Sequence, residues 1–285
     1  MKRYRAACDA WRDVHTGSGA WPSRGQQSTL VSTMTESREP GLPTIDVREY
    51  GGKRGTERQS MDRRLYMQLL VLDAPPGYAG DELAKRLGDA CVSAGVAAVV
   101  YADAMAPQGV GLLTWSEDPA HFVRSVRPLF ARDEISRATL RSDYSMIGRT
   151  YATGHEPDLE WTLMRRPIEN VQNEAYRWHV WYPLRRTGAF ARLEPHDQGQ
   201  ILREHAQIGM AYGAQELAHD IRLACYGLDA ADSEFVIGLV GRELHPLSHL
   251  VQAMRKTRQT SEFIERMGPF FIGYVARHVG SAASS

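Results

Sequence analysis

Hydrophobic and polar positions divide the chain into a polar start and a regular remainder. Residues 16–61 are rich in Gly, Ser, Thr, Pro, Arg and Gln and show no apolar periodicity. Such a segment cannot bury enough apolar surface to fold alone, so we expect residues 1–61 to form a disordered tail, or to result in part from an upstream start. The alternative is a small capping subdomain built on two tryptophans, Trp11 and Trp21.

Residues 62–153 predict the order β-α-β-β-α-β. Tyr66–Asp73 is strand-like and is followed by an Ala-Pro-Pro-Gly turn. The apolar residues of Asp81–Ala94 recur at helical spacing up to Gly95, a typical C-terminal stop. The other expected elements are a hairpin of strands 96–103 and 110–116, a helix that Asp118 caps before Pro119, and a strand at 139–150.

Residues 178–279 repeat this order. The expected strands are 178–184, closed by Pro183, then 221–228, 234–240 and 270–276, with helices at 196–212 and 246–257. Gly111–Phe130 and Val236–Met254 are alike, because each is an apolar strand, a polar turn and a helix that starts with proline. We therefore predict an α+β fold of two tandem ferredoxin-like repeats, whose sheets pack into a dimeric α+β barrel type fold. Such a barrel has room for one flat ligand between its sheet and helices.

A linker at 154–177 separates the two repeats, and residues 280–285 are expected to form a disordered C-terminal tail. A connection this long inside a compact domain is usually functional or mobile, and a simple surface loop is the alternative. The linker residues of interest are His155, Arg165, Arg166, Pro167 and Asn170.

Composition narrows the function without assigning it. The 34 Lys and Arg residues balance 34 Asp and Glu residues, which argues against the broad cationic face of a nucleic-acid-binding protein. Three scattered cysteines, Cys8, Cys91 and Cys225, are too few for a disulfide framework, so we expect a cytoplasmic protein. No apolar run approaches the ~18 residues of a membrane helix, so we expect no membrane association.

His205 is the first candidate for chemistry, because the chain has no nucleotide-binding glycine loop, zinc-protease motif or serine-hydrolase motif. It shares one helix stripe with Ile201, Ile208 and Tyr212. A histidine that faces the core must be hydrogen-bonded or must ligate something, and a hydrogen-bonded core histidine is the simpler alternative. Nearby Gly209 would let a flat group approach the helix closely.

Tyr182 is the second candidate, near a strand end and before Arg185 and Arg186. Positive charge favours phenolate, so we expect the two guanidinium groups to make this phenol easier to deprotonate or oxidise. The alternative is a core aromatic residue beside two solvated arginines. Arg255 follows an apolar helix run, where an arginine commonly complements the helix dipole.

Together these pieces resemble the chlorite dismutase and coproheme decarboxylase superfamily. Its pattern is Y-P-x-x-K/R and then a helix with H-x-x-x-G-x-x-Y, found here at Tyr182–Arg186 and His205–Tyr212. The resemblance covers residues 64–277 and implies a tandem ferredoxin-like barrel that assembles as a homopentamer. Three later segments also fit in order and spacing: Gly227–Asp229, Leu250–Arg255 and Pro269–Gly273.

The resemblance also implies roles for individual residues. His205 would ligate haem iron, and Tyr182 would be oxidised to a radical that abstracts hydrogen from a porphyrin propionate. Arg186 and Arg255 would pair with propionates, and Arg185 and Arg222 are further cofactor-binding candidates. The cofactor would be haem b, or iron coproporphyrin III (coproheme) as both cofactor and substrate, with hydrogen peroxide as the co-substrate.

The chain departs from the chlorite-degrading members in two places. They carry a tryptophan pair where this chain has Phe190 and Ala191. They also carry a distal arginine after the proximal helix. A longer connection here leaves three candidates for that position, His219, Asp220 and Arg222. The linker histidine His155 does not match the offset of the histidine in actinobacterial decarboxylases.

We therefore expect a peroxide-dependent coproheme decarboxylase of haem biosynthesis. A divergent haem b enzyme, peroxidase-like or chlorite dismutase-like, is the first alternative. A non-enzymatic haem-binding or assembly barrel is the second, and a monooxygenase-like barrel without metal is the third.

Overall fold

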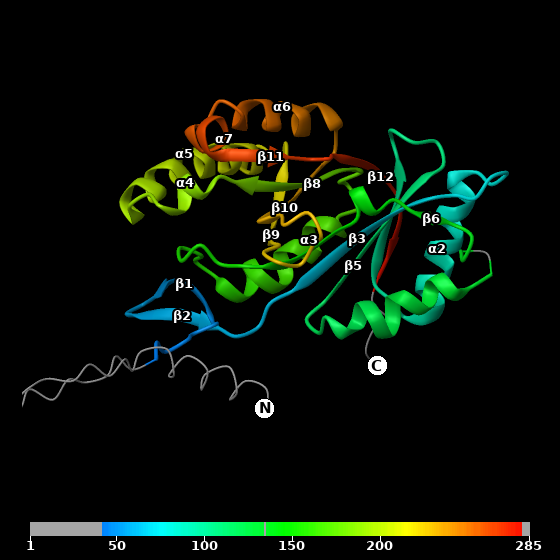
Figure 1. Cartoon of the computed structure of the whole chain (residues 1–285), viewed down its shortest axis with the longest axis horizontal. Helices are drawn as coiled ribbons and strands as arrows, with labels where there is room; N and C mark the ends of the chain where they lie inside the picture. Colours follow the sequence, from blue (N-terminus) through cyan, green and yellow to red (C-terminus); the bar gives the residue numbers. More distant parts are fainter. Residues whose placement is uncertain (1–41, 134, 281–285) are drawn as a thin grey trace, which may run out of the picture. The chain divides into compact units, whose positions relative to one another are not determined.

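The computed structural model describes residues 42–133 and 135–280, and the unit that begins at Asp46 contains a closed β-barrel with helices on its outside (Figure 1). Consecutive pairings run in the order β10-β9-β7-β3-β5-β4-β12-β8, and β10 also pairs with β8, which closes the ring. All of these pairings are antiparallel. The predicted two-repeat α+β barrel is confirmed.

The first repeat supplies four strands of this ring. Helix α2 buries Leu83 and Leu87 and ends at Gly95, whose φ of 65° is the left-handed conformation expected of a terminating glycine. The elements of this repeat are β3 (Tyr66–Asp73), α2 (Gly80–Ala94), β4 (Ala98–Asp103), β5 (Gly109–Ser116), η1 (Phe122–Val126), η2 (Arg127–Ala131), β6 (Thr139–Leu140), η3 (Ser142–Tyr144) and β7 (Met146–Thr150).

The second repeat supplies the other four strands. Its elements are β8 (Trp178–Arg186), α4 (Gly188–Ala191), α5 (Pro195–Ala214), β9 (His219–Ala224), β10 (Phe235–Gly241), α6 (Leu244–Met254), α7 (Arg258–Phe263), β11 (Ile264–Met267) and β12 (Phe271–Val279). Helix α7 and strand β11 were not expected from the sequence. Within the described residues, no helix has both the length and the apolar character that crossing a membrane requires.

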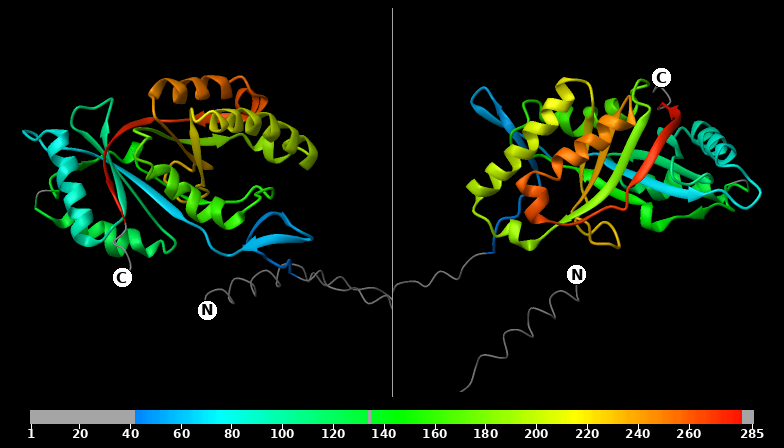
Figure 2. Two further views of the ribbon diagram at one scale, coloured as in Figure 1. Left: turned by 180° about the vertical axis from the view of Figure 1, so that it is seen from behind. Right: turned by 90° about the horizontal axis from the view of Figure 1, so that it is seen from above.

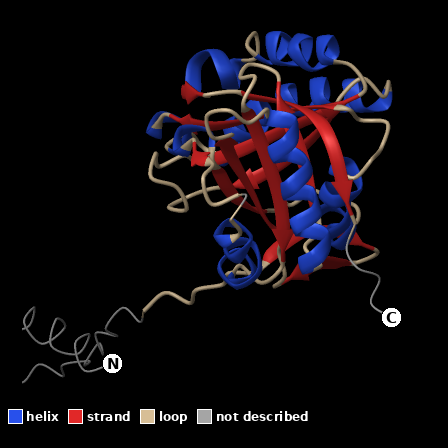
Figure 3. Ribbon diagram, turned by 90° about the vertical axis from the view of Figure 1, so that its right-hand side faces the viewer, coloured by secondary structure: helices blue, strands red, loops and turns tan. Residues whose placement is uncertain are grey.

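Apolar side chains form three main layers. The barrel interior holds Trp181 and Tyr101, whose rings are fully buried. Gly238 makes room for the Trp181 ring, because a Cβ at this glycine would lie 2.6 Å from a ring carbon. A second layer fills the space between helix α2 and the strands of the first repeat, which we call the first half-sheet; those of the second repeat form the second half-sheet. Helix α2 lies in front of the strands in Figure 3. The third layer lies between the second half-sheet and helices α5 and α6 (Figure 2).

Part of the predicted N-terminal tail is folded. Strands β1 (Glu49–Arg54) and β2 (Glu57–Met61) form an antiparallel hairpin, so a tail reaching residue 61 is wrong for this stretch. The hairpin is attached to the linker, because the Gly52 amide donates to the Glu156 carbonyl at 2.9 Å. Trp11 and Trp21, on which the alternative depended, lie outside the described residues.

The linker is also structured, so the surface-loop alternative is wrong. It contains η4 (Trp161–Arg165) and α3 (Arg166–Val171). Its apolar side chains join the cluster that fills the barrel interior, namely Leu159, Leu163, Met164 and Val171. The linker therefore contributes to the core and is held in place by it.

Two prolines act differently from the sequence prediction. Pro183 does not close its strand, since β8 continues to Arg186 and Pro183 lies opposite Val236 of β10. One missing N–H removes a single ladder bond, and the paired residues on both sides keep the strand extended. The helix expected after Pro119 is a π-helical turn followed by a 3₁₀ helix, because Pro128 lacks the N–H that a regular helix needs.

Candidate functional site

The outer face of the second half-sheet carries the polar residues that the sequence singled out. Ile237 of β10 lies opposite Tyr182 of β8 on one side and Arg222 of β9 on the other. Side chains two residues apart in a strand share a face, so the next row on this face is Val180, Leu239 and Asp220. The face is therefore an apolar floor with a phenol on one side and an ion pair on the other.

Helix α5 covers this face with a stripe that is only partly packed. Ile201 is its one buried residue, while His205, Ile208 and Tyr212 are half-buried. The remaining positions of the helix are mostly exposed, so the predicted stripe is confirmed as the inward side. Figure 2 shows α5 beside α6 across the sheet, and Ile208 and Tyr212 pack against the cluster that contains Tyr182.

The imidazole of His205 is neutral and has no hydrogen-bond partner in the part of the chain that the structure describes. Burial is the main cause that lowers the pKa of His205, and the positive charge of Arg222 lowers it further, while Asp220 acts in the opposite direction. Its Nδ1 atom is buried without a partner, and no hydrogen bond to either ring nitrogen is found among the described residues. A neutral imidazole with a free lone pair is the form that binds a metal.

The set of donors fits an iron porphyrin better than a metal ion bound by protein alone. Within the part of the chain that the structure describes, no group of three or more His, Cys, Asp or Glu side chains is placed to hold a metal. One imidazole can hold iron when a porphyrin supplies the equatorial nitrogens. The apolar floor below α5 suits a flat macrocycle, and nearby guanidinium groups suit its carboxylates.

Tyr182 is protonated, contrary to the expectation that nearby arginines make it easier to deprotonate. Burial raises the pKa of this phenol, the negative charge of Asp220 raises it further, and only Arg255 lowers it. The ring stacks on Phe270 with centroids 4.5 Å apart, and no hydrogen bond to its hydroxyl is found among the described residues. The phenol therefore keeps its proton, and none of the described residues supplies a base in contact with it.

Asp220 and Arg222 form an ion pair with a residue from the linker. The Arg166 guanidinium donates to Asp220 Oδ1 at 2.5 Å, and Arg222 Nε lies 3.0 Å from Oδ2. Burial acts to raise the pKa of Asp220, but the two arginines outweigh it, so the net pKa is lowered and the carboxylate is ionised. The Arg222 and Asp220 side chains are 38% and 34% exposed, so the ion pair is only partly covered and stays accessible from solvent.

The other predicted arginines are placed differently. Arg255 follows α6, is exposed, and makes no ion pair among the described residues, although it lies close enough to lower the pKa of Tyr182. Arg186 is held by Glu234 at 3.0 Å and covers the Phe235 ring, so its charge is already neutralised. Arg185 lies on the face of β8 opposite to that of Tyr182 and Arg186, because the side chains of consecutive strand residues point to alternate faces.

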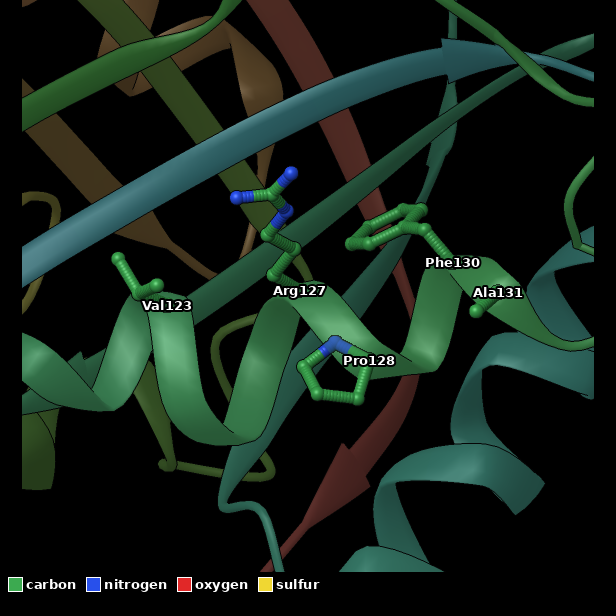
Figure 4. Close-up of a pocket in the computed structure, with 5 residues that line it drawn as sticks. All are labelled: Val123, Arg127, Pro128, Phe130 and Ala131. Carbon is green, nitrogen blue, oxygen red and sulfur yellow. The ribbon is translucent and has the colours of Figure 1, made fainter.

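A pocket lies on the first repeat, over η1 and η2 (Figure 4). It carries one cation, Arg127, and no acid, nucleophile or metal ligand. The other lining residues are Val123, Pro128, Phe130 and Ala131. This pocket has fewer reactive side chains than the sheet face beneath α5, so we take that face as the candidate site.

Comparison with known proteins identifies the family of this chain. The sequence model of the chlorite dismutase family matches residues 130–276, just over half of the 285-residue chain. This chain belongs to the chlorite dismutase family. Its members bind haem. No curated protein matches the chain.

Several solved structures have the same fold as this chain. TA0507, a provisionally assigned chlorite dismutase, is 15% identical with a TM-score of 0.62, and the match covers 75% of this chain and 96% of that one. A mutant chlorite dismutase from Candidatus Nitrospira defluvii in complex with cyanide is 13% identical, with a TM-score of 0.58 and coverage of 75% and 91%. The enzyme from the same organism in complex with imidazole gives 12% identity, the same TM-score and the same coverage.

The structure narrows the three candidates for the distal position of the family. His219 is bonded to the Tyr176 hydroxyl at 2.7 Å and stacks on that ring, away from the floor. Asp220 and Arg222 both lie on the sheet face that α5 covers. The Asp220 carboxylate is already paired with two arginines, Arg166 and Arg222. His155 is exposed and has no side-chain contact with these residues. Arg222 is therefore the guanidinium placed across the floor from Tyr182.

The contact between Arg166 and Asp220 could not be found from the sequence. The two residues are 54 positions apart, and neither belongs to the motif that surrounds His205. The only signal was the charge of the linker itself, which contains Arg165 and Arg166 in succession.

Proposed function

We propose that this chain binds an iron porphyrin through His205 and acts as a peroxide-dependent coproheme decarboxylase, with Tyr182 as the radical residue. The observation that carries the proposal is the His205 imidazole, which is neutral, has no hydrogen-bond partner in residues 42–133 and 135–280, and lies above a floor that Tyr182 borders. Family membership supports the cofactor, and the position of the phenol supports the reaction.

Each residue has a role that follows from its surroundings. His205 would hold the iron, while Arg222 and Arg255 would hold carboxylates of the porphyrin through charge-assisted hydrogen bonds. Bound haem supplies the one-electron and peroxide chemistry that no amino-acid side chain provides. Tyr182 keeps its proton because burial raises its pKa, so it offers a whole hydrogen atom rather than a phenolate.

The reaction would use Tyr182 as a hydrogen-atom carrier. After losing its hydrogen atom, the phenoxyl oxygen takes another from a propionate carbon of coproheme. The carboxylate would then leave as carbon dioxide as a carbon–carbon double bond forms, and the remaining electron, like that of the first hydrogen atom, would go to hydrogen peroxide, which is reduced to water. The buried phenol is shielded from bulk water, which protects the radical from side reactions.

The ion pair on β9 favours peroxide over chlorite as the co-substrate. The Asp220 carboxylate lies 3.0 Å from Nε of Arg222, which leaves the terminal nitrogens to a propionate that the bound macrocycle holds in place, whereas a small free anion such as chlorite must compete with that carboxylate for the guanidinium charge. Hydrogen peroxide is neutral and meets no such competition. The chlorite dismutase-like alternative is favoured by the presence of an arginine on β9 at all, and by the names of the structural neighbours.

The variant Tyr182→Phe tests the mechanism. We expect it to bind coproheme as the unaltered protein does, and to lose decarboxylation when peroxide is added, because the ring remains and the transferable hydrogen is gone. Binding is followed by visible absorption and loss of carboxylate by mass spectrometry of the porphyrin. Conversion of coproheme by Tyr182→Phe would disprove the mechanism. Oxygen release from chlorite, without any loss of carboxylate, would establish the chlorite dismutase-like alternative.

A further inference from the structure

Tyr212 is a second tyrosine that borders the site. It follows His205 by seven residues on α5, so the two side chains share one helix face and lie about 10 Å apart along the helix axis. Tyr212 is half-buried and packs against the apolar cluster that contains Tyr182 and Val180. It is therefore close to the same apolar floor, near the C-terminal end of α5.

The hydroxyl of Tyr212 is paired with a base. It lies 2.5 Å from Nδ1 of His249 on α6, and the two ring centroids are 6.0 Å apart. With His249 in the tautomer that carries its proton on Nε2, the phenol donates to Nδ1. His249 is exposed and its ring lies 5.9 Å from that of His245, one turn earlier on the same helix. A proton accepted by His249 can therefore pass on to water.

This pairing distinguishes Tyr212 from Tyr182. A phenol that loses an electron becomes a much stronger acid, so its oxidation is easier when a hydrogen-bonded base can take the proton in the same step. Tyr182 has no hydrogen-bond partner among the described residues, and Phe270 covers its ring. Tyr212 has an imidazole in contact and solvent beyond it. Of these two phenols, Tyr212 has the arrangement of an oxidisable residue with a proton outlet.

We propose that Tyr212 is a second redox-active tyrosine of this protein and that His249 accepts its proton. One electron leaves the phenol, the O–H bond breaks, and an N–H bond forms at His249 Nδ1. The physiological oxidant rests on the proposed function, in which hydrogen peroxide is the terminal electron acceptor and is reduced to water. When no propionate is within reach of Tyr182, Tyr212 supplies one electron to the oxidant, so that one oxidising equivalent leaves the site as a radical on Tyr212.

A spin-trapping experiment on the full-length protein tests this assignment with an oxidant that needs no haem. Flash-generated ruthenium(III) tris-bipyridine oxidises the haem-free protein in the presence of a nitroso spin trap, and peptide mass spectrometry locates the adducts. We expect an adduct at Tyr212, and its loss in Tyr212→Phe. His249→Asn should lower its yield several-fold, because the amide oxygen of asparagine can accept the hydrogen bond of the phenol but cannot take up its proton. His245→Asn is the matched control, because His245 is exposed on the same helix and does not touch the phenol.

A second arm uses the haem-loaded protein and hydrogen peroxide, and it separates this inference from the proposed function. A Tyr212 adduct that depends on His249 in the ruthenium arm supports the redox pair, whether or not peroxide converts coproheme. No adduct at Tyr212, or an equal yield in His249→Asn and His245→Asn, overturns it. Loss of the peroxide-dependent adduct alone, with the ruthenium result intact, would count against the proposed function and leave the pair standing.

Discussion

Tyr182 and Arg222 lie in one row of the barrel sheet, on either side of Ile237. The register of β10 fixes this relationship, because Ile237 is paired with both residues through the two neighbouring strands. A phenol and a guanidinium held on opposite sides of an apolar residue can contact opposite ends of one flat ligand. The distance between them is set by backbone hydrogen bonds and does not depend on any flexible loop.

Arg222 should therefore contribute to porphyrin affinity, whereas Arg185 should not. A charge-assisted hydrogen bond is worth about 1.5–3 kcal/mol, so Arg222→Gln should weaken coproheme binding about tenfold to a hundredfold. Arg222→Lys should recover part of this loss, since it keeps the charge without the planar fork. Arg185→Gln is the matched control, because Arg185 lies on the other face of β8. Absorption titration gives the affinities, and an equal loss in Arg185→Gln would contradict this placement.

His205 should remain a competent ligand in moderately acidic solution. Its pKa is lowered from 6.5 by burial, so the neutral form persists as the pH falls through 6.5, and protonation begins only at lower pH. Porphyrin binding should therefore be unchanged through pH 6.5 and should be lost below it. The measurement is a pH titration of the absorption spectrum of the loaded protein. His205→Gly should lose the spectrum of the ligated iron and regain it when free imidazole is added, which a purely structural role would not produce.

The sequence predicted the strands and helices whose apolar period is uninterrupted. Strand β3 was predicted to its last residue, and the α5 stripe through His205 was identified correctly from its spacing. Both elements bury one face against a layer of side chains, so tertiary packing and local pattern agree. The hairpin at 49–61 has no such apolar pattern, so the sequence did not predict it. It is held instead by polar contacts, among them the ion pair of Glu49 with Arg149 at 2.9 Å.

The candidate site was predicted only where its residues lie within one motif. His205 and Tyr182 were singled out from the sequence because each lies in a short segment with a distinctive spacing, and the structure places both at the candidate site. The sequence did not predict that Glu234 pairs with Arg186, since the two residues are 48 positions apart and meet only through the pairing of β10 with β8. Long-range ion pairs depend on strand register, and register cannot be read from charge alone.

The pair between Arg166 and Asp220 should be energetically coupled. Both side chains are largely covered, with 23% and 34% of their surface exposed, so solvent screens the pair only in part. A double-mutant cycle with Arg166→Met and Asp220→Asn in urea unfolding should give a coupling free energy of about 1 kcal/mol. The exposed pair of Lys85 and Asp89, at 2.9 Å, is the control and should give only about 0.3–0.5 kcal/mol. Equal coupling in the two cycles would mean that the linker pair is no better shielded than a surface pair.

His179 should make the stability of the barrel depend on pH. It is fully buried, accepts a hydrogen bond at Nδ1 from the Tyr101 hydroxyl at 2.8 Å, and donates from Nε2 to the Tyr176 carbonyl at 3.2 Å. Burial lowers its pKa to about 3, whereas an unfolded chain has the ordinary value of 6.5. Below pH 6.5 the unfolded state therefore binds a proton that the folded state does not, so stability is full above this pH and falls as the pH decreases towards 3.

The size of this effect follows from the proton difference. One proton corresponds to about 1.4 kcal/mol of unfolding free energy per pH unit, and the whole interval corresponds to a loss on the order of 4 kcal/mol. Urea unfolding of the unaltered protein and His179→Gln at neutral and acidic pH measures the difference between their slopes. The glutamine variant should be less stable at neutral pH and should lose this part of the pH dependence, while the exposed His155→Gln should keep it. If the slopes of the unaltered protein and His179→Gln coincide, the buried imidazole takes up its proton without unfolding, and the Tyr101 hydroxyl would no longer donate to it.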